Sequence, residues 1–381
     1  MNTSSIYIHI PFCEQICFYC DFNKFYIKNQ PVEEYVEALL LEMQQAASSA
    51  DSHPVKTIYL GGGTPTALET AQLEKVIRGV KSCFRLREDD VEMTVEVNPG
   101  EVEKDKLAML YKNGVNRLSI GVQSFDNTLL KKIGRTHSAE SAISTVNMAK
   151  AAGFSNLSID LMFGLPGQTM ESWEHTIDQA MKLDISHVSA YSLKIEEKTM
   201  FYNWYRQGRI SAMEQDEEAM MFEVLLERLT GAGIFPYEIS NFARPGMESR
   251  HNITYWKNEG YFGFGAGAHG YADGRRYANI APLTHYIEAV KNGKSPKKEV
   301  HEVPLKEQME EEMFMGLRMR EGVSRSQFKR KYGSEMDCVF SEAINDLINE
   351  GLLLDTGETV QLTEKGKFLG NEVFERFLLT E

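Results

Sequence analysis

The feature that most constrains the fold is a regular alternation of short apolar runs with stretches of helical periodicity. Runs rich in β-branched and apolar residues predict strands at 6–10, 57–61, 92–97, 117–123, 157–163 and 187–193. Apolar residues three and four positions apart predict helices at 32–43, 70–83, 104–113, 138–152 and 169–182. This alternation is typical of a parallel sheet with crossover helices, and six such units predict an open barrel of six strands rather than a closed eight-stranded one.

The unusual residues of this region follow the predicted strands. A cysteine-rich loop at 13–20 follows the first strand, GGGTPT (61–66) the second, NPG (98–100) the third, QSF (123–125) the fourth and GLPGQT (164–169) the fifth. In folds built from parallel strands, the chemistry lies in the loops after the carboxyl ends of the strands. We therefore expect these five loops to form one site.

Composition narrows the functional class. The 381 residues carry a formal net charge of −14, which argues against binding nucleic acid or an anionic membrane surface. No apolar run approaches the ~18 residues of a membrane span, and the first residues lack the basic and long apolar regions of a signal peptide. The cysteine count of 5 is odd, and three of them share one loop, so a disulfide framework is not expected. We predict a cytoplasmic protein.

The pattern changes at about residue 214, which predicts three regions at 1–213, 214–300 and 301–381. The last region has helical stretches at 305–319, 324–332 and 337–350, then two strands around a turn within 352–366 and a final helix, an order that resembles a winged helix. Residues 304–381 hold 10 Lys and Arg against 16 Asp and Glu, with one basic patch, RSQFKRK, at 325–331. Because phosphate contacts dominate DNA affinity, this acidity disfavours a DNA-binding regulator.

The spacing Cys13-x3-Cys17-x2-Cys20 lets three thiolates converge on one small cluster. Iron–sulfur clusters take thiolate ligands, and a cubane held through three irons leaves the fourth open to another ligand. A structural zinc normally has four protein ligands, which the loop does not supply. His9 could complete a zinc site, but it lies inside a predicted strand.

This spacing, with Tyr19 directly before the last cysteine, resembles the signature of the radical S-adenosylmethionine (SAM) superfamily. The resemblance implies a partial (β/α)6 barrel and a [4Fe–4S] cluster on Cys13, Cys17 and Cys20. The open iron would then bind SAM, and reduction of the cluster would cleave SAM to a 5′-deoxyadenosyl radical. The implied SAM-binding residues are Tyr7, Tyr19, Gly62, Gly63, Thr64, Glu96, Gln123, Arg135 and Asp160. Taken alone, the triple glycine would be a tight turn, and the polar residues would be solvated or would cap helices.

Further segments resemble the coproporphyrinogen III dehydrogenase-like branch of that superfamily: YIHIPFC, GGGTPT, VNP, GVQSF, GLPGQT and the C-terminal helical region. The dehydrogenase pattern continues to CxxxCxxCxC, whereas this chain has Phe22. The chain also carries HNITYW at 251–256, an HNxxYW motif that marks a group of heme chaperones in this branch. The resemblance therefore implies a protein that binds heme and transfers it to an acceptor such as a respiratory hemoprotein. The alternative is the oxygen-independent dehydrogenase, a radical SAM decarboxylase, so whether the chain is an enzyme stays open.

The HNxxYW motif suits heme chemistry. His251 offers an imidazole, a common axial ligand of heme iron, and Tyr255 and Trp256 offer apolar faces with polar tips. Arg250 could bind a propionate. The resemblance implies heme contacts from His251, Asn252, Tyr255 and Trp256.

The motif also has a purely structural interpretation. It could be a turn that enters a strand, with Asn252 as a cap, the two aromatic residues in the core and His251 at the surface. His269, held among small residues, is a rival iron ligand. Cys83 and Cys338 lie in helical stretches, where free cysteines are usually small core hydrophobes, and nothing supports covalent heme attachment to either.

Overall fold

Six parallel strands form the centre of the structure, a computed structural model that describes residues 3–47, 53–87 and 90–379. The strands lie side by side in chain order: β1 (Thr3–Ile10), β4 (Thr57–Gly62), β5 (Glu92–Val97), β6 (Arg117–Gln123), β7 (Asn156–Phe163) and β8 (His187–Ser192). The first and last of them do not pair with each other, because β1 also pairs with β11 and β8 with β10. The predicted open six-stranded barrel is confirmed.

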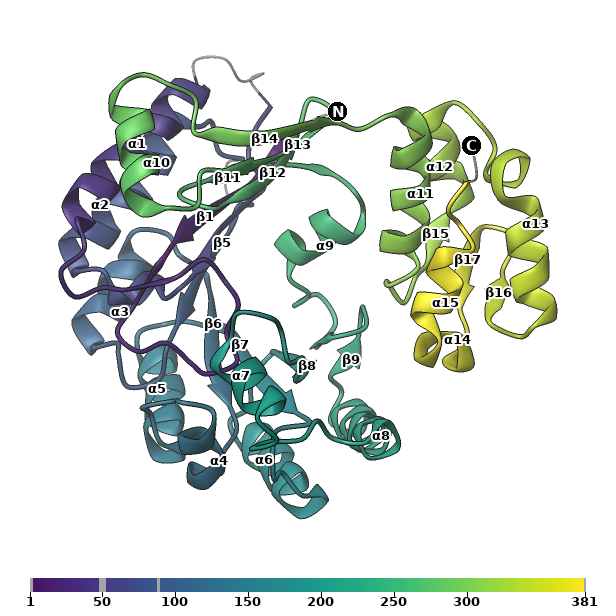
Figure 1. Cartoon of the computed structure of the whole chain (residues 1–381), viewed down its shortest axis with the longest axis horizontal. Helices are drawn as coiled ribbons and strands as arrows, with labels where there is room; N and C mark the ends of the chain where they lie inside the picture. The colour runs from purple at the N-terminus through teal and green to yellow at the C-terminus, as the bar shows by residue number, and fades with distance from the viewer. Residues whose placement is uncertain (1–2, 48–52, 88–89, 380–381) are drawn as a thin grey trace.

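Crossover helices cover one face of this sheet (Figure 1). Five were predicted and are confirmed: α1 (Val32–Ala47), α2 (Thr70–Cys83), α3 (Lys104–Lys112), α5 (Ala139–Ala151) and α6 (Met170–Lys182). Two short helices, α4 (Asn127–Lys132) and α7 (Met200–Arg206), were not predicted, because six or seven residues are too few to establish a helical period.

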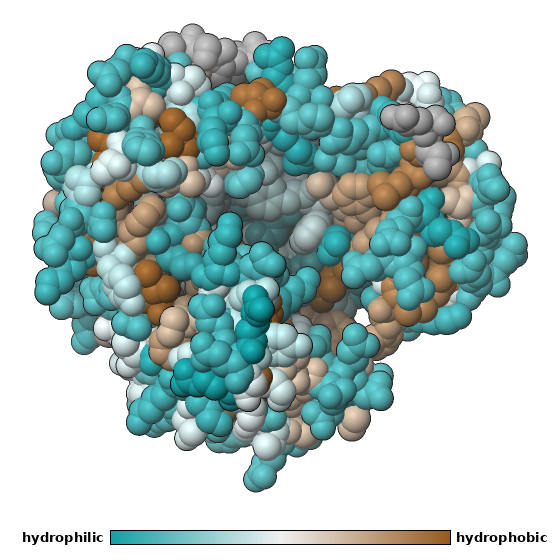
Figure 2. Space-filling view, in the orientation of Figure 1, coloured by the Kyte–Doolittle hydropathy of each residue, from teal (hydrophilic) through white to brown (hydrophobic). Residues whose placement is uncertain are grey.

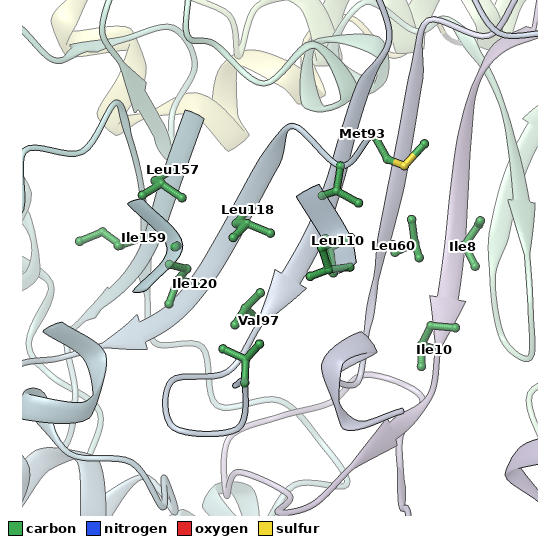
Figure 3. Close-up of a cluster of buried hydrophobic side chains, with 14 of the residues drawn as sticks. Ile8, Ile10, Leu60, Met93, Val97, Leu110, Leu118, Ile120, Leu157 and Ile159 are labelled. Carbon is green, nitrogen blue, oxygen red and sulfur yellow. The ribbon is translucent and has the colours of Figure 1, made fainter. Parts of the chain in front are cut away.

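The two faces of the parallel strands differ in chemistry. The residues of the helix-covered face are apolar, and Figure 3 shows Ile8, Leu60, Leu118 and Ile159 among them, with Leu110 of α3 packed against the sheet. The alternate residues are mostly polar: Ser5, Tyr7, His9, Thr57, Tyr59, Thr94, Glu96, Arg117, Ser119, Ser158, Asp160, His187 and Ser189. Parallel strands buried by helices on both faces have near-continuous apolar sequences. The observed alternation means that one face of the sheet is a polar interior.

Residues 215–302 extend the sheet at both edges and cover part of its polar face. At one edge lie β10 (Asn241–Ala243) and β9 (Phe235–Pro236). At the other edge, β11 (Gly260–Phe264) runs parallel to β1 and is followed by β12 (His269–Ala272), β13 (Arg275–Asn279) and β14 (Lys297–Glu302). The helices of this region are α8 (Gln215–Gly231), α9 (Arg250–Trp256) and α10 (Leu283–Lys291). Figure 1 shows α9 on the opposite side of the sheet from α1, α2 and α3.

The C-terminal region has its own apolar core, which includes Phe328, Ile344 and Phe377. Its elements are α11 (Leu305–Gly316), β15 (Val323–Ser324), α12 (Arg325–Tyr332), α13 (Met336–Asn349), β16 (Leu353–Asp355), β17 (Thr359–Leu362), α14 (Glu364–Phe368) and α15 (Gly370–Glu375). The three strands form one small antiparallel sheet, in keeping with the winged-helix order. The boundaries at 213/214 and 300/301 stay predictions.

The basic patch of this region is largely neutralised by ion pairs. Arg325 pairs with Asp337 and Asp355 at 2.9 Å each. Lys329 pairs with Glu335, and Lys331 with Glu312 at 2.7 Å. Cations already engaged by carboxylates are poorly suited to phosphate contacts, which fits the prediction against DNA binding.

Several contacts attach the C-terminal region to the rest of the structure, among them an ion pair between Lys257 and Glu321 at 3.0 Å. Arg276 of β13 forms a two-pronged ion pair with Glu311 of α11, at 2.8 and 2.7 Å. Lys331 donates to the carbonyl oxygen of Lys257, just after α9, at 2.6 Å. Figure 2 shows a hollow between the main body and the C-terminal region. Among the described residues, no helix is long and apolar enough to cross a membrane.

Candidate functional site

The cysteine-rich loop leaves the carboxyl end of β1 and is held by backbone hydrogen bonds. Its short strand β2 (Phe12–Cys13) pairs in parallel with β3 (Phe25–Tyr26), which holds the two ends of the loop side by side. The amide of Phe18 donates to the carbonyl of Ile133, and the amide of Phe201 donates to the carbonyl of Phe18, at 3.0 Å each. The loop is therefore fixed between the segments that follow β6 and β8.

All three cysteines of the loop are free thiols, of which Cys13 is buried and Cys17 and Cys20 are partly buried. Burial, with smaller contributions from the neighbouring thiols of Cys20 and Cys17, raises the pKa of the Cys13 thiol to about 12. Within the described residues, no three His, Cys, Asp or Glu side chains lie close enough together to hold a metal ion in this conformation. The three thiols nevertheless lie on one loop, where Cys17 and Cys20 influence the pKa of Cys13. This set of soft sulfur donors fits an iron–sulfur cluster better than a hard cation.

The glycines of GGGTPT are required by close backbone approach to this loop. A Cβ on Gly63 would lie 2.7 Å from the carbonyl oxygen of Phe12, and one on Gly62 would lie 2.4 Å from the imidazole of His9. Gly62 also has a φ of 113°, which residues with a side chain rarely adopt. The amides of Gly63 and Thr64 donate to the carbonyls of Ile10 and Phe12 at 2.8 and 2.7 Å. The triple glycine is therefore a packing requirement of the loop.

A continuous set of polar contacts runs from Cys13 across three further loops. The Thr64 hydroxyl lies 3.7 Å from Cys13 Sγ and accepts a 2.9 Å hydrogen bond from the Asn98 amide. Arg135 donates to Asn98 Oδ1 at 2.8 Å and to the Tyr19 hydroxyl at 3.2 Å. Residues after β1, β4, β5 and β6 are thus brought together, whereas no hydrogen bond among the described residues joins the fifth predicted loop, GLPGQT (164–169), to this set. Asn98 links them, and only its position in the NPG segment pointed to it.

Glu96 is a buried carboxyl beside the glycine loop. Its two oxygens accept hydrogen bonds from the Tyr59 hydroxyl at 2.8 Å and from the amide of Gly62 at 3.0 Å. Burial raises the pKa of Glu96 to about 7, against the stabilising hydrogen bond from Tyr59. On the neighbouring strand, Tyr7 bonds to His9 Nδ1 at 2.9 Å, and His9 Nε2 bonds to the carbonyl of Asn23 in the cysteine loop at 2.8 Å.

Gln123 and Asp160 lie on the same polar face. Gln123 ends β6 with a φ of 64° at an irregularity in the pairing with β7, which turns the strand at this point. Asp160 accepts from the Ser119 hydroxyl at 3.1 Å, and burial raises the pKa of its carboxyl. The guanidinium of Arg117, which is 1% exposed, lowers the pKa of Asp160 and is the buried cation of this face.

The HNxxYW motif forms helix α9, which Ser249 caps by accepting from the amide of Asn252 at 3.3 Å. His251 is 1% exposed, and both of its ring nitrogens are bonded: Nδ1 to the Thr57 hydroxyl and Nε2 to the Tyr255 hydroxyl, each at 2.8 Å. Its ring stacks on Tyr59 with centroids 5.1 Å apart. Burial lowers the pKa of His251 to about 3, so the imidazole is neutral.

The structural interpretation of the motif is wrong in three details. The motif is a helix rather than a turn into a strand, His251 is buried rather than at the surface, and the cap is Ser249 rather than Asn252. The hydrophobic pattern of the sequence did not indicate the helix or the burial of His251, because the hydrogen-bond partners of His251 are polar. Asn252 and Trp256 are partly exposed, and the guanidinium of Arg318 in the C-terminal region lies 5.6 Å from the Trp256 ring.

Two other residues considered for heme differ in availability. The Arg250 guanidinium pairs with Asp90 at 2.6 Å and is not free for a propionate in this conformation. His269 at the start of β12 is exposed, and no hydrogen bond of its ring is recorded among the described residues.

Comparisons with known proteins agree with this geometry. Residues 7–180 match the Radical SAM superfamily, and residues 303–369 match the HemN C-terminal domain. The chain is 49% identical to the heme chaperone HemW of Bacillus subtilis, over 98% of this chain and 99% of that protein. It is 35% identical to the heme chaperone HemW of Escherichia coli, over 98% of both. A solved structure of coproporphyrinogen III oxidase (HemN) from E. coli superimposes with a TM-score of 0.86 and 24% identity, over 99% of this chain and 90% of that one, which shows the shared fold.

The partial barrel, the CxxxCxxC loop at the end of its first strand and the glycine loop beside it define a radical SAM protein. This class implies a [4Fe–4S] cluster and SAM as ligands. Within it, the chain belongs to the HemW family.

Proposed function

We propose that this chain is a heme chaperone, which binds heme and passes it to an acceptor hemoprotein. The observation that carries the proposal is the 49% identity, over 98% of the chain, to a protein named as a heme chaperone. Phe22 supports it, because an exposed aromatic side chain stands where the dehydrogenase pattern has a fourth cysteine. Five free cysteines fit a reducing compartment, and we place the protein in the cytoplasm.

We assign the cluster to Cys13, Cys17 and Cys20 and SAM to the polar rim around them. When bound, the cluster would supply an iron with an open coordination position for SAM and the electron for its cleavage. The chain itself supplies close backbone approach and counter-charge, the latter from Arg135 beside the loop. The rim residues assigned to SAM are Tyr7, Tyr19, Gly62, Gly63, Thr64, Glu96, Gln123, Arg135 and Asp160.

We assign heme to the α9 motif, with contacts from His251, Asn252, Tyr255 and Trp256. The neutral imidazole of His251 is the form that binds a metal, but its Nε2 reaches iron only if the Tyr255 hydroxyl moves away. His269 is the alternative iron ligand, because its ring is exposed. The net charge of −14 favours an acceptor with a basic docking face.

The second candidate function is the oxidative decarboxylation of coproporphyrinogen III. It is favoured by one observation, the TM-score of 0.86 to coproporphyrinogen III oxidase. Fold alone does not determine activity, because one fold supports many reactions.

An anaerobic heme titration of the cluster-reconstituted protein, followed by Soret absorbance, tests the proposal. We expect a saturable band near a single equivalent of heme. His251→Ala and His269→Ala are titrated in parallel, and the variant whose heme spectrum changes identifies the iron ligand. A missing saturable band, together with turnover of coproporphyrinogen III, would replace the chaperone by the decarboxylase.

A further inference from the structure

Tyr59 lies between the residues assigned to SAM and those assigned to heme. Its hydroxyl donates to Glu96 at 2.8 Å, and the other oxygen of Glu96 accepts from the amide of Gly62. One face of the Tyr59 ring stacks near Tyr7, with centroids 6.2 Å apart, and the ring also stacks on His251 at 5.1 Å. A single side chain therefore contacts both proposed sites.

His251 cannot coordinate heme iron and keep all of its present contacts. Both ring nitrogens are bonded inside the polar interior, and the amide of His251 donates to Glu92 of β5 at 3.0 Å. Binding a metal takes one ring nitrogen, so either Thr57 or Tyr255 loses its partner. Because the ring is 1% exposed, heme can reach its Nε2 only if Tyr255 or the imidazole itself moves, and an imidazole that moves leaves the face of Tyr59.

We propose that Tyr59 is a positioning residue that couples the two sites, so that heme on the α9 motif weakens SAM binding and SAM weakens heme binding by the same factor. The inference rests on the proposed heme function. When His251 leaves the face of the Tyr59 ring, Tyr59 is less constrained. Glu96 then loses the hydrogen bond from the Tyr59 hydroxyl, which orients the carboxyl toward the glycine loop. Reciprocity is a thermodynamic requirement, since the coupling free energy belongs to the pair of ligands.

The shared side chain offers a conservative test. Tyr59→Phe keeps the ring against His251 and removes only the hydroxyl that donates to Glu96. Tyr286→Phe is the matched control, because Tyr286 is also a buried tyrosine whose hydroxyl donates to a buried carboxylate, Glu42, but it contacts neither site. Comparing the two variants separates the general effect of removing a buried tyrosine hydroxyl from a specific loss of coupling between heme and SAM binding.

The measurement is the Kd of SAM for the cluster-reconstituted full chain, by anaerobic calorimetry, with and without saturating heme. We expect heme to raise the Kd of SAM at least ~5-fold in the wild type and in Tyr286→Phe, the lower end of typical couplings. In Tyr59→Phe we expect the ratio to fall toward unity.

Three results would overturn the proposal. One is a ratio near unity in the wild type, and another is an unchanged ratio in Tyr59→Phe. The third is an equal loss of coupling in Tyr286→Phe, which would assign the effect to general loosening. If heme does not bind in the titration without SAM, the proposed function fails first, and the coupling fails with it.

Discussion

Thr64 shows how one side chain on the rim serves two neighbours. Its hydroxyl lies against the Cys13 sulfur and also accepts from Asn98, which in turn is held by Arg135. The sequence pointed to Thr64 through its motif alone, and the structure adds the reason: it joins the thiol loop to the loop after β5. At the scale of single residues, the site consists of such paired contacts.

Each loop cysteine is expected to be indispensable for the cluster. Cys13→Ala, Cys17→Ala or Cys20→Ala leaves two thiols, and we expect the anaerobically reconstituted variants to lose the iron–sulfur absorbance. Cys338→Ala is the control, because its thiol is exposed and lies in the C-terminal region. Wild-type iron and sulfide content in any of the three loop variants would show that the ligand set is wrong.

Gly63→Ala is expected to destabilise the chain by ~1–3 kcal/mol, the usual cost of forcing an extra methyl group into a packed position. The reason is the 2.7 Å approach of the new Cβ to the carbonyl of Phe12. Gly231→Ala at the end of α8 meets nothing within 4 Å and should be neutral or stabilising by up to ~1 kcal/mol. Chemical denaturation compares the two, and equal effects would remove the steric argument.

The buried imidazole of His251 makes the stability of the folded chain depend on pH, and the sign of this dependence follows from its pKa. Its pKa is about 3 in the folded chain, so between ~6.5 and about 3 only the unfolded state takes up the proton, and stability falls as pH falls. Glu42 and Glu96, whose pKa values burial raises to about 7, act in the opposite sense, so the test must be a difference. We expect the stability advantage of wild type over His251→Gln to shrink from pH 7 to pH 4.

Denaturant titrations at each pH measure this difference. His285→Gln, at an exposed position, is the control substitution. An advantage of wild type over His251→Gln that stays constant with pH would mean that the imidazole is hydrated in solution.

At the scale of elements, sequence reasoning succeeded where side-chain chemistry repeats regularly. All six parallel strands and the five long crossover helices were found, because their apolar faces pack on a single core. It failed for α9, whose inward residues His251 and Thr254 bond to Thr57 and Ser5 rather than to apolar neighbours. A helix that buries hydroxyls and an imidazole has no apolar stripe to reveal it. The partner strands are also distant in sequence, so no local pattern could show the pairing.

The start of α9 is attached to the sheet through one carboxylate, which makes its stability testable. Glu92 accepts from the amides of Arg250 and His251 at 2.9 and 3.0 Å. Glu92→Ala leaves two buried donors unpaired, and we expect a loss of ~1–3 kcal/mol with faster hydrogen exchange at both amides. Glu227→Ala on the exposed side of α8 should stay within ~0.5 kcal/mol. Unchanged exchange in Glu92→Ala would mean that α9 is held by packing alone.

At the scale of the whole molecule, one of the contacts that attach the C-terminal region is a largely buried ion pair. The Arg276 and Glu311 side chains are only 27% and 9% exposed, and Arg276 also lies 4.3 Å from the centroid of the Tyr271 ring. The sequence predicted a separate region, but its attachment could not be predicted, because an arginine and a glutamate 35 positions apart carry no pairing signal. The walls of the hollow in Figure 2 depend on this attachment.

Removing one partner of the Arg276–Glu311 pair should lower the stability of the chain more than removing both partners. Arg276→Ala leaves a buried carboxylate without its partner, for which we expect a loss of ~3–5 kcal/mol. The double variant with Glu311→Ala should recover part of that loss. Thermal unfolding and limited proteolysis near residue 303 measure the loss of stability. The exposed pair Arg228–Asp178 is the control, and breaking it should lower the stability by only ~0.2–1 kcal/mol. Additive single effects would show that the two side chains act independently.

The pairing of β1 with both β4 and β11 has a consequence for biosynthesis. The two neighbours of β1 begin at Thr57 and Gly260, so a ribosome at ~5–20 residues per second needs on the order of ten seconds to a minute before the second neighbour exists. Throughout that interval one edge of β1 in the nascent chain is unpaired, and the cysteine loop directly follows this strand. A chain that ends before β11 therefore keeps an unpaired sheet edge on the strand that leads into the cysteine loop.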